Sequence, residues 1–484
     1  MNLRTAFSRV IRNRLGAAEL ATSGVICMLT VLACRGDTDS TAGWDGTVRD
    51  SAGVQIVENL GAPLWPEGPG WEFTQDLRIG AVDGPPEYQF GRIGGLQVLS
   101  DGRFAVTDVM AHDLRIFSQA GEYECTVGRP GQGPGEFGSG SLGLFWGPGD
   151  TLLVSDPANN RMNIVAPNGT WLDSWPRLPM DGSAGSYWTG SVPTGRLVSV
   201  HHPLRQNDGT LTDTLDIALE RNVHGAILDT LARLPSYLTF FRGGPETLMR
   251  YYNAWWEVRQ WGAGLMIART DRYRFSFYGP DGGLERIVSL VREPLAITDE
   301  DRSVMLAGWD AFLQERGVPA DTWEEYKSRL LFSDTYPSYR LSFYGPAGTL
   351  LVQRVRPLHD LSAEERKEVR ANSPYAPRSA EWDVFDAQGR YLGVVVIPGT
   401  GFPKPSGFFR FYQDRTSGTW YMASVWEDEL EVQFIVRWRI DGRMPVGDDG
   451  QDPRKSITVG GGAGSQLSAS GKGAGVSRGV SPPR

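Results

Sequence analysis

The sequence predicts an all-β protein built from one repeated group of strands. Its 484 residues include 60 glycines and 31 prolines, which is typical of a chain with many turns. Residues 101–128 and 149–175 align as a turn, an apolar strand ending in Asp, an Arg-containing strand, a Gly turn and a further strand. The two copies start about 48 residues apart, which suits a four-stranded propeller blade. Such a blade buries both faces only by stacking on neighbours around an axis.

Looser copies of the same group predict six blades. They cover residues 194–234, 262–290, 339–398 and 408–440, and each pairs apolar or alternating strands with a Gly turn. The last copy lacks its final strand, whereas the N-terminal segments 53–60 and 71–80 are strand-like. We therefore expect a six-bladed β-propeller with short helical insertions, in which an N-terminal strand closes the last blade and leaves no free sheet edge.

Two insertions have helical signals. Residues 297–317 place Thr298 at an N-cap position and put Met305, Trp309 and Phe312 on one helical face. Residues 361–372 begin with LSAEE, in which a serine and a glutamate have the spacing of a capping box, and this predicts a short surface helix between strands.

The N-terminus has the pattern of an export signal. Four arginines precede the apolar run from Gly24 to Cys34, which is too short for a stop-transfer helix. The run ends in Val31-Leu32-Ala33-Cys34, which resembles the bacterial lipobox, and that resemblance implies that Cys34 carries the lipid; the alternative is an uncleaved signal anchor. Because Arg35 rather than an aspartate follows the cysteine, we expect the outer membrane or cell surface rather than the inner membrane.

The predicted domains follow from this pattern. Residues 1–33 form the signal peptide, 34–50 a flexible tether, 51–442 the propeller and 443–484 a disordered tail rich in Gly and Ser. The tail has almost no large apolar side chains, so it cannot bury enough surface to offset the entropy of ordering.

Charge limits the classes of partner. The whole chain has net charge −9; without the four arginines and one glutamate of the leader and the slightly basic tail, about −15 remains on the propeller. An acidic body argues against nucleic acid and against a charge-driven membrane contact. The lipid would therefore provide the membrane anchor.

The Gly-rich segment from Gly128 to Phe137 is GRPGQGPGEF. A phosphate-binding loop would lead through Gly-Lys-Ser/Thr into a helix, and a dinucleotide site would need a βαβ unit. Here the loop leads into another apolar strand. We expect its glycines to supply positive φ as the chain crosses from the outer strand of one blade to the inner strand of the next.

These motifs resemble a known family. The copies are similar to NHL-type, TolB-like six-bladed propellers, and the chain from Asp50 to about residue 440 resembles bacterial lipoproteins of that group whose function is uncharacterised. The residues that carry the resemblance are Gly128, Gly131, Gly133, Pro134, Gly135, Glu136 and Phe137, together with Asp108, Asp156, the strands LRIF and RMNIV, and the opening DSAGVQIVEN.

Motifs for metal, cofactor or nucleophilic chemistry are missing from the sequence. His201 and His202 are strand neighbours and so point to opposite faces; there is no HExxH, CxxC, calcium loop or G-x-S-x-G. We therefore expect no metal and no cofactor. Asp108 and Asp156 recur at one repeat position, where they could ring a channel, but a loop-capping role is the favoured interpretation.

The predicted innermost strands are RIGGLQV, SLGLFWG, SYWTGSV, NAWWEVR, PSYRLSF and GFFRFYQ, which together offer one acid, Glu257. This disfavours a channel metal site. Aromatic and arginine side chains could instead bind a sugar, a peptide or an aromatic ligand, or they could simply pack between blades. The candidate ligand-binding residues are Arg92, Trp146, Trp188, Trp255, Trp256, Arg340 and Arg410.

Three functions remain open at this point. The favoured hypothesis is a non-catalytic exported lipoprotein that binds an envelope protein, peptide or glycan. The alternatives are a lactonase, lyase or hydrolase with a site in the central channel, and a structural component of the cell envelope. Propellers host all three, so the fold does not choose among them.

Overall fold

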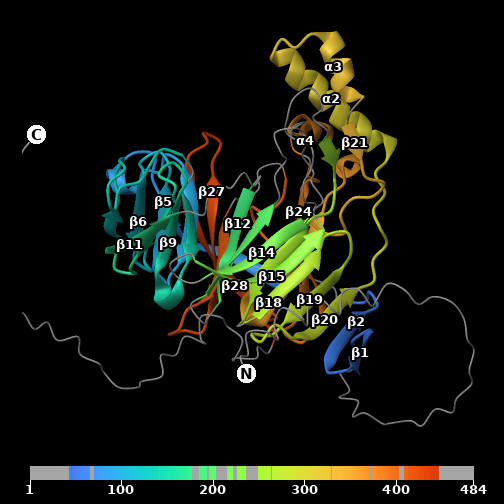
Figure 1. The fold of residues 1–484 in the computed structure, drawn as a ribbon, viewed down its shortest axis with the longest axis horizontal. Helices are drawn as coiled ribbons and strands as arrows, with labels where there is room; N and C mark the ends of the chain where they lie inside the picture. The colour runs from blue at the N-terminus through green and yellow to red at the C-terminus, as the bar shows by residue number, and fades with distance from the viewer. Residues whose placement is uncertain are drawn as a thin grey trace, which may run out of the picture.

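The computed structural model describes residues 43–445, apart from 66–69, 141, 177–184, 193–195, 203–214, 222–225, 236–248, 263, 329, 370–372, 374 and 403–407. The predicted signal peptide, the lipidation site Cys34 and nearly all of the tail lie outside the described residues. The described chain is a ring of β-sheets with a helical insertion projecting from one end (Figure 1).

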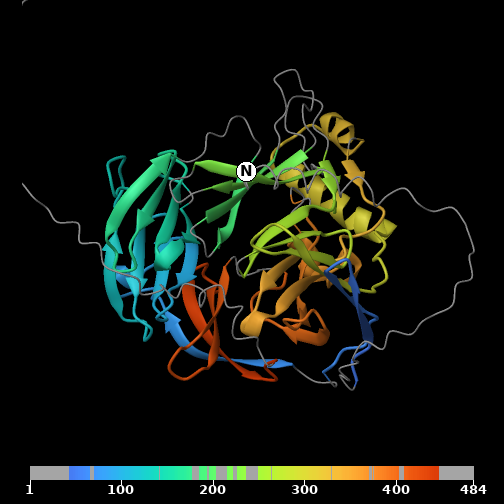
Figure 2. The ribbon, with the colours of Figure 1, turned by 60° about the horizontal axis from the view of Figure 1, so that its bottom comes forward.

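Six four-stranded antiparallel groups form the blades, as predicted, and they are arranged around a common centre (Figure 2). Blade one is β4 (Ile93–Val98), β5 (Phe104–Asp108), β6 (Asp113–Phe117) and β7 (Tyr123–Val127); blade two is β8 (Gly143–Trp146), β9 (Leu152–Asp156), β10 (Arg161–Val165) and β11 (Trp171–Pro176); blade three is β12 (Gly185–Val192), β13 (Arg196–His202), β14 (Leu215–Arg221) and β15 (Ile227–Pro235).

The second half of the ring continues the pattern. Blade four is β17 (Trp256–Trp261), β18 (Gly264–Arg269), β19 (Arg274–Tyr278) and β20 (Leu284–Leu290); blade five is β22 (Leu341–Tyr344), β23 (Leu350–Val355), β24 (Arg378–Phe385) and β25 (Tyr391–Val396); blade six is β26 (Phe409–Gln413), β27 (Trp420–Glu427), β28 (Gln433–Gly442) and β3 (Trp71–Ile79).

The N-terminal strand β3 closes the ring. It pairs antiparallel with β28, from Ile79 opposite Ile435 to Trp71 opposite Gly442, which confirms that one N-terminal segment completes the last blade. Both Trp71 and Ile79 are buried, so the closing strand is held by packing as well as by its ladder. An N-terminal strand is thereby tied to the last strand of the described chain.

The other N-terminal segment extends blade four instead. Strand β2 (Val54–Asn59) runs parallel to β20, and β1 (Gly46–Ser51) pairs with β2, which makes this sheet six-stranded. Strand β1 begins at Gly46 and so extends into the segment expected to be a tether. Figure 1 shows the two strands at the edge of the ring beside β20.

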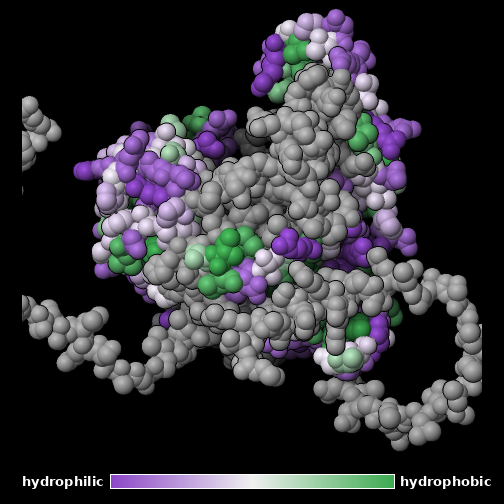
Figure 3. All heavy atoms as spheres, in the orientation of Figure 1, coloured by the Kyte–Doolittle hydropathy of each residue, from purple (hydrophilic) through white to green (hydrophobic). Residues whose placement is uncertain are grey.

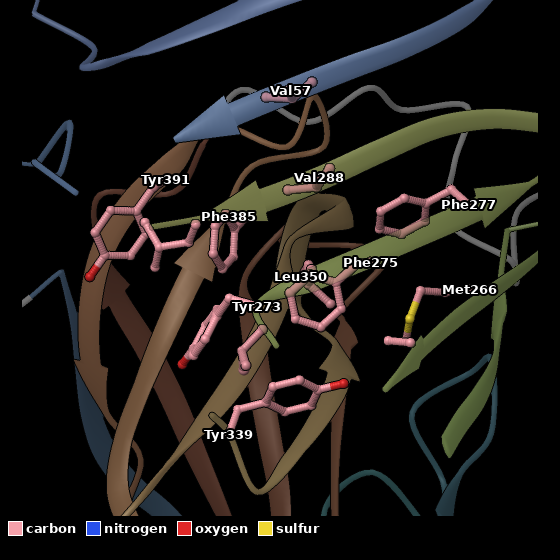
Figure 4. Packing of buried hydrophobic residues seen from close by; sticks show 13 residues of the cluster. Val57, Met266, Tyr273, Phe275, Phe277, Val288, Tyr339, Leu350, Phe385 and Tyr391 are labelled. Atoms are coloured by element: carbon pink, nitrogen blue, oxygen red, sulfur yellow. The ribbon is translucent and has the colours of Figure 1, made fainter. Parts of the chain in front are cut away.

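Apolar side chains fill the spaces between neighbouring blades. Between blades four and five, Phe275 and Val288 pack in one cluster with Leu350 and Phe385, and Val57 of β2 joins them (Figure 4). Comparable buried clusters lie between blades one and two, five and six, and six and one. Burial of large side chains at about 1.5–3 kcal/mol each makes this stacking the main source of stability for the ring.

The helical insertion emerges between blades four and five. Helices α2 (Asp299–Glu315) and α3 (Ala320–Lys327) lead to β21 (Leu330–Phe332), which pairs parallel with β16 (Met249–Tyr251), and α4 (Ala363–Lys367) follows inside blade five. Short 3-10 helices are Pro86–Tyr88, Pro148–Asp150, Pro346–Gly348 and Leu358–Asp360. The projecting surface of the insertion carries both hydrophilic and hydrophobic residues (Figure 3).

The predicted helix starts are confirmed. Thr298 accepts a hydrogen bond from the Asp301 N–H and Ser362 from the Glu365 N–H, each completing a capping box. Met305 is buried in the core of the insertion, and Trp309 packs against it. Helix α3 was not expected from the sequence. Among the described residues, no helix combines the length and the hydropathy needed to cross a membrane.

Candidate ligand-binding site

The Gly-rich loop has a structural role in the described chain. It joins β7 to β8, with φ of 92° at Gly128 and 71° at Gly135, as its interpretation as a blade connection requires. Arg161 of β10 donates to the carbonyls of Gln132 and Gly133 at 3.0 and 2.8 Å. A phosphate would need free N–H donors, but the Gly131 N–H donates to the Phe137 carbonyl at 3.1 Å and the Gly133 N–H to Oε2 of Glu136 at 2.8 Å, so these groups serve the turn.

The recurring aspartates cap loops, as predicted. Asp108 accepts hydrogen bonds from the backbone N–H groups of Gly91, Arg92 and Met110 at 2.8, 3.1 and 2.9 Å. Asp156 accepts from the Gly138 N–H at 3.2 Å. Each carboxylate ties the end of the second strand of a blade to the loop that enters the first strand of the same blade.

The inner strands were identified correctly in all six blades. Consecutive inner strands lie side by side around the axis, including β4 with β8, β12 with β17, and β26 with β4. They run in the same direction: Gly94 approaches Leu142, and Gln97 donates to the Leu144 carbonyl at 3.0 Å. Residues at the starts of these strands therefore share one end of the central channel.

The structure separates the candidate residues into two groups. At the starting end lie Trp255, Trp256, Arg340 and Arg92, whereas Trp146 ends β8. Arg92 is exposed, while Trp256 packs against blade-three residues.

The two remaining candidates, Trp188 and Arg410, belong to the inner strands of blades three and six. Trp188 belongs to β12, but its side chain is outside the described residues. Arg410 of β26 donates through Nε to Oε1 of Gln97 at 3.0 Å and through Nη1 to the Phe409 carbonyl at 2.8 Å.

A compact aromatic and arginine cluster forms at the starting end. The Arg340 guanidinium carbon lies 4.8 Å from the ring centre of Trp255 and 4.7 Å from that of Tyr375. The two rings meet edge to face with centroids 5.5 Å apart. Tyr375 is 43% exposed, so the cluster reaches solvent. Cation–π contacts of this kind hold the arginine without neutralising it.

Tyr375 is the residue that sequence reasoning missed. It lies in the segment SPYAP, between α4 and β24, more than a hundred positions from Trp255. An aromatic between two prolines in a loop has no strand periodicity, and only the folding of blade five beside blade four brings it to the channel. Its proximity to Pro374 and Pro377 was the one available hint of a fixed position.

Glu257, the residue after Trp256 on β17, is already engaged in hydrogen bonds within the chain. Its carboxylate is 2% exposed and accepts from the Ser342 hydroxyl at 2.7 Å and from Nη2 of Arg259 at 2.9 Å. Burial lowers the pKa of Arg410 to about 10, and the charge of Arg259 acts in the same direction. The inner strands thus hold more arginine charge than carboxylate charge.

The described histidines make local contacts. His112 Nδ1 lies 2.8 Å from the Gly138 carbonyl, and His359 Nδ1 lies 3.0 Å from each carboxylate oxygen of the buried Asp301. His201 and His202 lie on β13 with side chains outside the described residues. Within the described ranges, no group of three His, Cys, Asp or Glu side chains is arranged to hold a metal ion.

Comparisons with known proteins agree with the architecture. A family described as a 6-bladed beta-propeller matches residues 85–140, the segment that contains β4 to β7 and the Gly-rich loop. No curated protein matches the chain.

Solved structures similar to the chain include three propeller-type proteins. One from Bacteroides fragilis, proposed to be exported, is 12% identical with a TM-score of 0.44 and covers 80% of this chain and 100% of its own. Regucalcin, a calcium-binding protein from Agrobacterium tumefaciens, is 11% identical with a TM-score of 0.34 and coverages of 78% and 97%. Virginiamycin B lyase from Staphylococcus aureus is 9% identical with a TM-score of 0.35 and coverages of 76% and 99%.

Proposed function

We propose that the chain is an exported, lipid-anchored β-propeller that acts as a non-catalytic binding or scaffold module for a protein, peptide or glycan at the cell envelope. The observation that carries this proposal is the contact of Arg340 with Trp255 and Tyr375 at one end of the channel. Flat aromatic faces and a guanidinium beside solvent are the groups that such ligands contact.

The acids near the channel support binding over catalysis. Asp108 and Asp156 are committed to backbone N–H groups, and Glu257 to Arg259 and Ser342. A general base or nucleophile needs an electron pair that is not already engaged in holding the fold. These three carboxylates therefore serve the scaffold that presents the aromatic and arginine cluster.

Ligand binding is tested by a thermal-shift screen of the full-length chain against oligosaccharides and peptides. We expect a hit to raise the melting temperature, because a ligand that binds only the folded state stabilises it. The hit should weaken in Trp255→Ala and persist in Trp426→Ala, a control that truncates a partly exposed tryptophan on β27. Persistence of every hit in Trp255→Ala would refute binding at this end of the channel, and conversion of the ligand to product would favour the enzyme alternative.

The anchor is tested separately through Cys34. Replacing Cys34 by Ser should move the protein from the membrane fraction to the soluble exported fraction, because a serine cannot take the thioether-linked lipid. Fractionation of cells expressing the wild type and Cys34→Ser measures this. Unchanged membrane association of the variant would contradict lipidation at Cys34 and would leave the channel experiment unaffected.

A further inference from the structure

Two arginines at the starting end of the channel lack acceptors in the described part of the chain. Arg340 makes no side-chain hydrogen bond there, and its Nε is buried without a partner. Arg378, at the start of β24, is half-buried, and no hydrogen bond or ion pair offsets the burial that lowers its pKa. A buried donor left unpaired costs about 1–3 kcal/mol, so a ligand that supplied an acceptor at this place would recover that free energy.

Arg340 and Arg378 lie on either side of Gln353 in β23. The Arg340 N–H donates to the Gln353 carbonyl at 2.8 Å, and Nε2 of Gln353 donates to the carbonyl of Ser379, the neighbour of Arg378, at 2.8 Å. Burial, followed by the positive charge of Arg378, lowers the pKa of Arg340 to about 10. Glu257 acts in the opposite direction, but its oxygens already accept from Arg259 and Ser342. Positive charge is therefore in excess around Arg340 and Arg378, although the propeller as a whole carries a negative net charge.

Other partly buried arginines of the same blade are neutralised. Arg354 donates to Asp383 at 2.9 Å and to Glu381 at 2.8 Å. Arg356 forms a two-pronged pair with Glu365. Since blade five pairs these arginines with carboxylates, the absence of such an acceptor at Arg340 and Arg378 within the described residues is specific to the channel end.

We propose that Arg340 and Arg378 together bind the carboxylate of a small ligand, whose flat or apolar body lies against Trp255 and Tyr375. The inference rests on the proposed function and names its ligand chemistry. Each guanidinium presents parallel N–H groups that match the two oxygens of a carboxylate. One bound carboxylate would supply acceptors to both arginines and remove most of their mutual repulsion.

The surroundings favour a singly charged carboxylate over a phosphate. Arg340 lies beside two aromatic rings. Tyr339, which precedes Arg340, and Ala376, which follows Tyr375, are both buried. The free-energy cost of moving an anion out of water rises steeply with its charge. A singly charged group thus loses less hydration while still pairing with both guanidinium groups.

The test uses two carboxylates with neutral twins, because an acidic sugar and an aromatic acid share the proposed chemistry. The probes are glucuronate against glucose and benzoate against benzamide, with inorganic phosphate as the competing anion. At a ligand concentration of ten times Kd, at least one carboxylate should raise the melting temperature of the full-length chain by about 1–3 °C. Its neutral twin should not. The shift should disappear in Arg340→Gln and in Arg378→Gln.

Two further variants keep the result interpretable. Arg415→Gln, which removes an exposed arginine in the turn after β26, should leave the shift unchanged. Arg340→Lys keeps the charge but loses the planar fork, so the carboxylate should bind at least several-fold more weakly. Both variants also report whether an altered shift reflects the site or a general change in stability.

The outcomes separate this inference from the proposed function. Equal shifts from glucuronate and glucose, or from benzoate and benzamide, would overturn the carboxylate site while supporting ligand binding. A shift from phosphate alone would overturn the preference for a carboxylate. No shift from either carboxylate up to tens of millimolar would also overturn the site, and the oligosaccharide and peptide screen would then decide the proposed function independently.

Discussion

The arginines that hold the loops of blades one and two differ from the arginines on the inner strands of blades five and six. In blade two, Arg161 donates to loop carbonyls and lies 3.6 Å from Asp156; in blade one, Arg115 contacts Asp108 in the same way at 3.4 Å. At the channel end of blade five, Arg340 has aromatic neighbours and no described acceptor. Arg410 of blade six reaches only neutral oxygens.

This difference separates arginines that stabilise the fold from arginines that do not. The arginines of the first two blades satisfy carbonyls and carboxylates that would otherwise be buried unpaired, so they stabilise the connections between blades. Arg340 donates no side-chain hydrogen bond to a described residue, and its burial costs hydration. A buried arginine that contacts only aromatic rings can bind an anionic ligand without first breaking an ion pair.

The largest expected effect is in blade one. Asp108→Ala should lower the free energy of unfolding by about 3–5 kcal/mol, because it leaves several backbone N–H groups without an acceptor and removes one of the two carboxylates that pair with the buried Arg115. Urea unfolding measures the change. Asp83→Ala, at an exposed position, is the control and should change stability by less than about 0.5 kcal/mol. Similar losses in the two variants would show that the loop cap is dispensable.

Blade two should respond next. Arg161→Gln removes the donors to the carbonyls of Gln132 and Gly133 and should cost about 1–3 kcal/mol in the same assay. Arg129→Gln is a matched control in this loop, since Arg129 is 78% exposed and its pair with Glu136 is worth little. A cost below that of Arg129→Gln would contradict the structural role of Arg161.

Blade five offers a neutralised arginine with a pH signature. Hydrogen bonds from Arg356, and then from the Ser362 N–H, lower the pKa of Glu365 to about 2. A carboxylate with a depressed folded pKa stabilises above its unfolded value near 4.5 and loses that contribution as the pH falls toward 2. Because Glu365 is partly exposed, the gain is below about 1 kcal/mol.

Urea unfolding of the wild type and Glu365→Gln at several pH values checks this sign. The stability difference between the two proteins should be full at pH 6 and should shrink as the pH falls below 4.5. A difference that stays constant over this range would show that the pair does not depend on the charge of Glu365.

The smallest effect on stability is expected at the channel. Arg340→Gln should change the free energy of unfolding by less than about 1 kcal/mol, because relief of desolvation and repulsion offsets the lost ring contacts. In the same blade, Arg354→Gln removes charged donors from the fully buried Asp383, which keeps Arg292 and two tyrosine hydroxyls, and should cost about 1.5–3 kcal/mol. If Arg340→Gln were as costly as Arg354→Gln, the comparison between scaffold and site arginines would fail.

Much of the architecture was predictable from local sequence. The recurring Asp at the strand end and the Gly turns gave the blades, because each blade is a contiguous hairpin array whose pattern repeats. The capping signals at Thr298 and Ser362 predicted two helix starts correctly. Helix α3, ADTWEEYK (Ala320–Lys327), was missed because it is short and because it belongs to the insertion, which does not follow the blade repeat.

The candidate site was only partly predictable. Inner-strand assignment selected Trp255, Arg340 and Arg410, yet it could not pair Arg340 with Tyr375 or Arg378, which follow it in the loop and strand after α4. It also grouped these residues with Trp146, which the structure places at the end of β8. Sequence indicates which strand faces the channel, but not the depth or the neighbour of a side chain.

The sequence by itself determined the blade repeat, the inner strand of every blade and the loop caps, because these depend on neighbours in the chain and on the two-residue period of a strand. Only the tertiary structure decided that Trp71–Ile79 closes the ring while Val54–Asn59 joins blade four, since both segments have strand character. It alone also distinguished neutralised arginines from those without an acceptor, because the pairing of a buried charge depends on packing between blades that are far apart in the sequence.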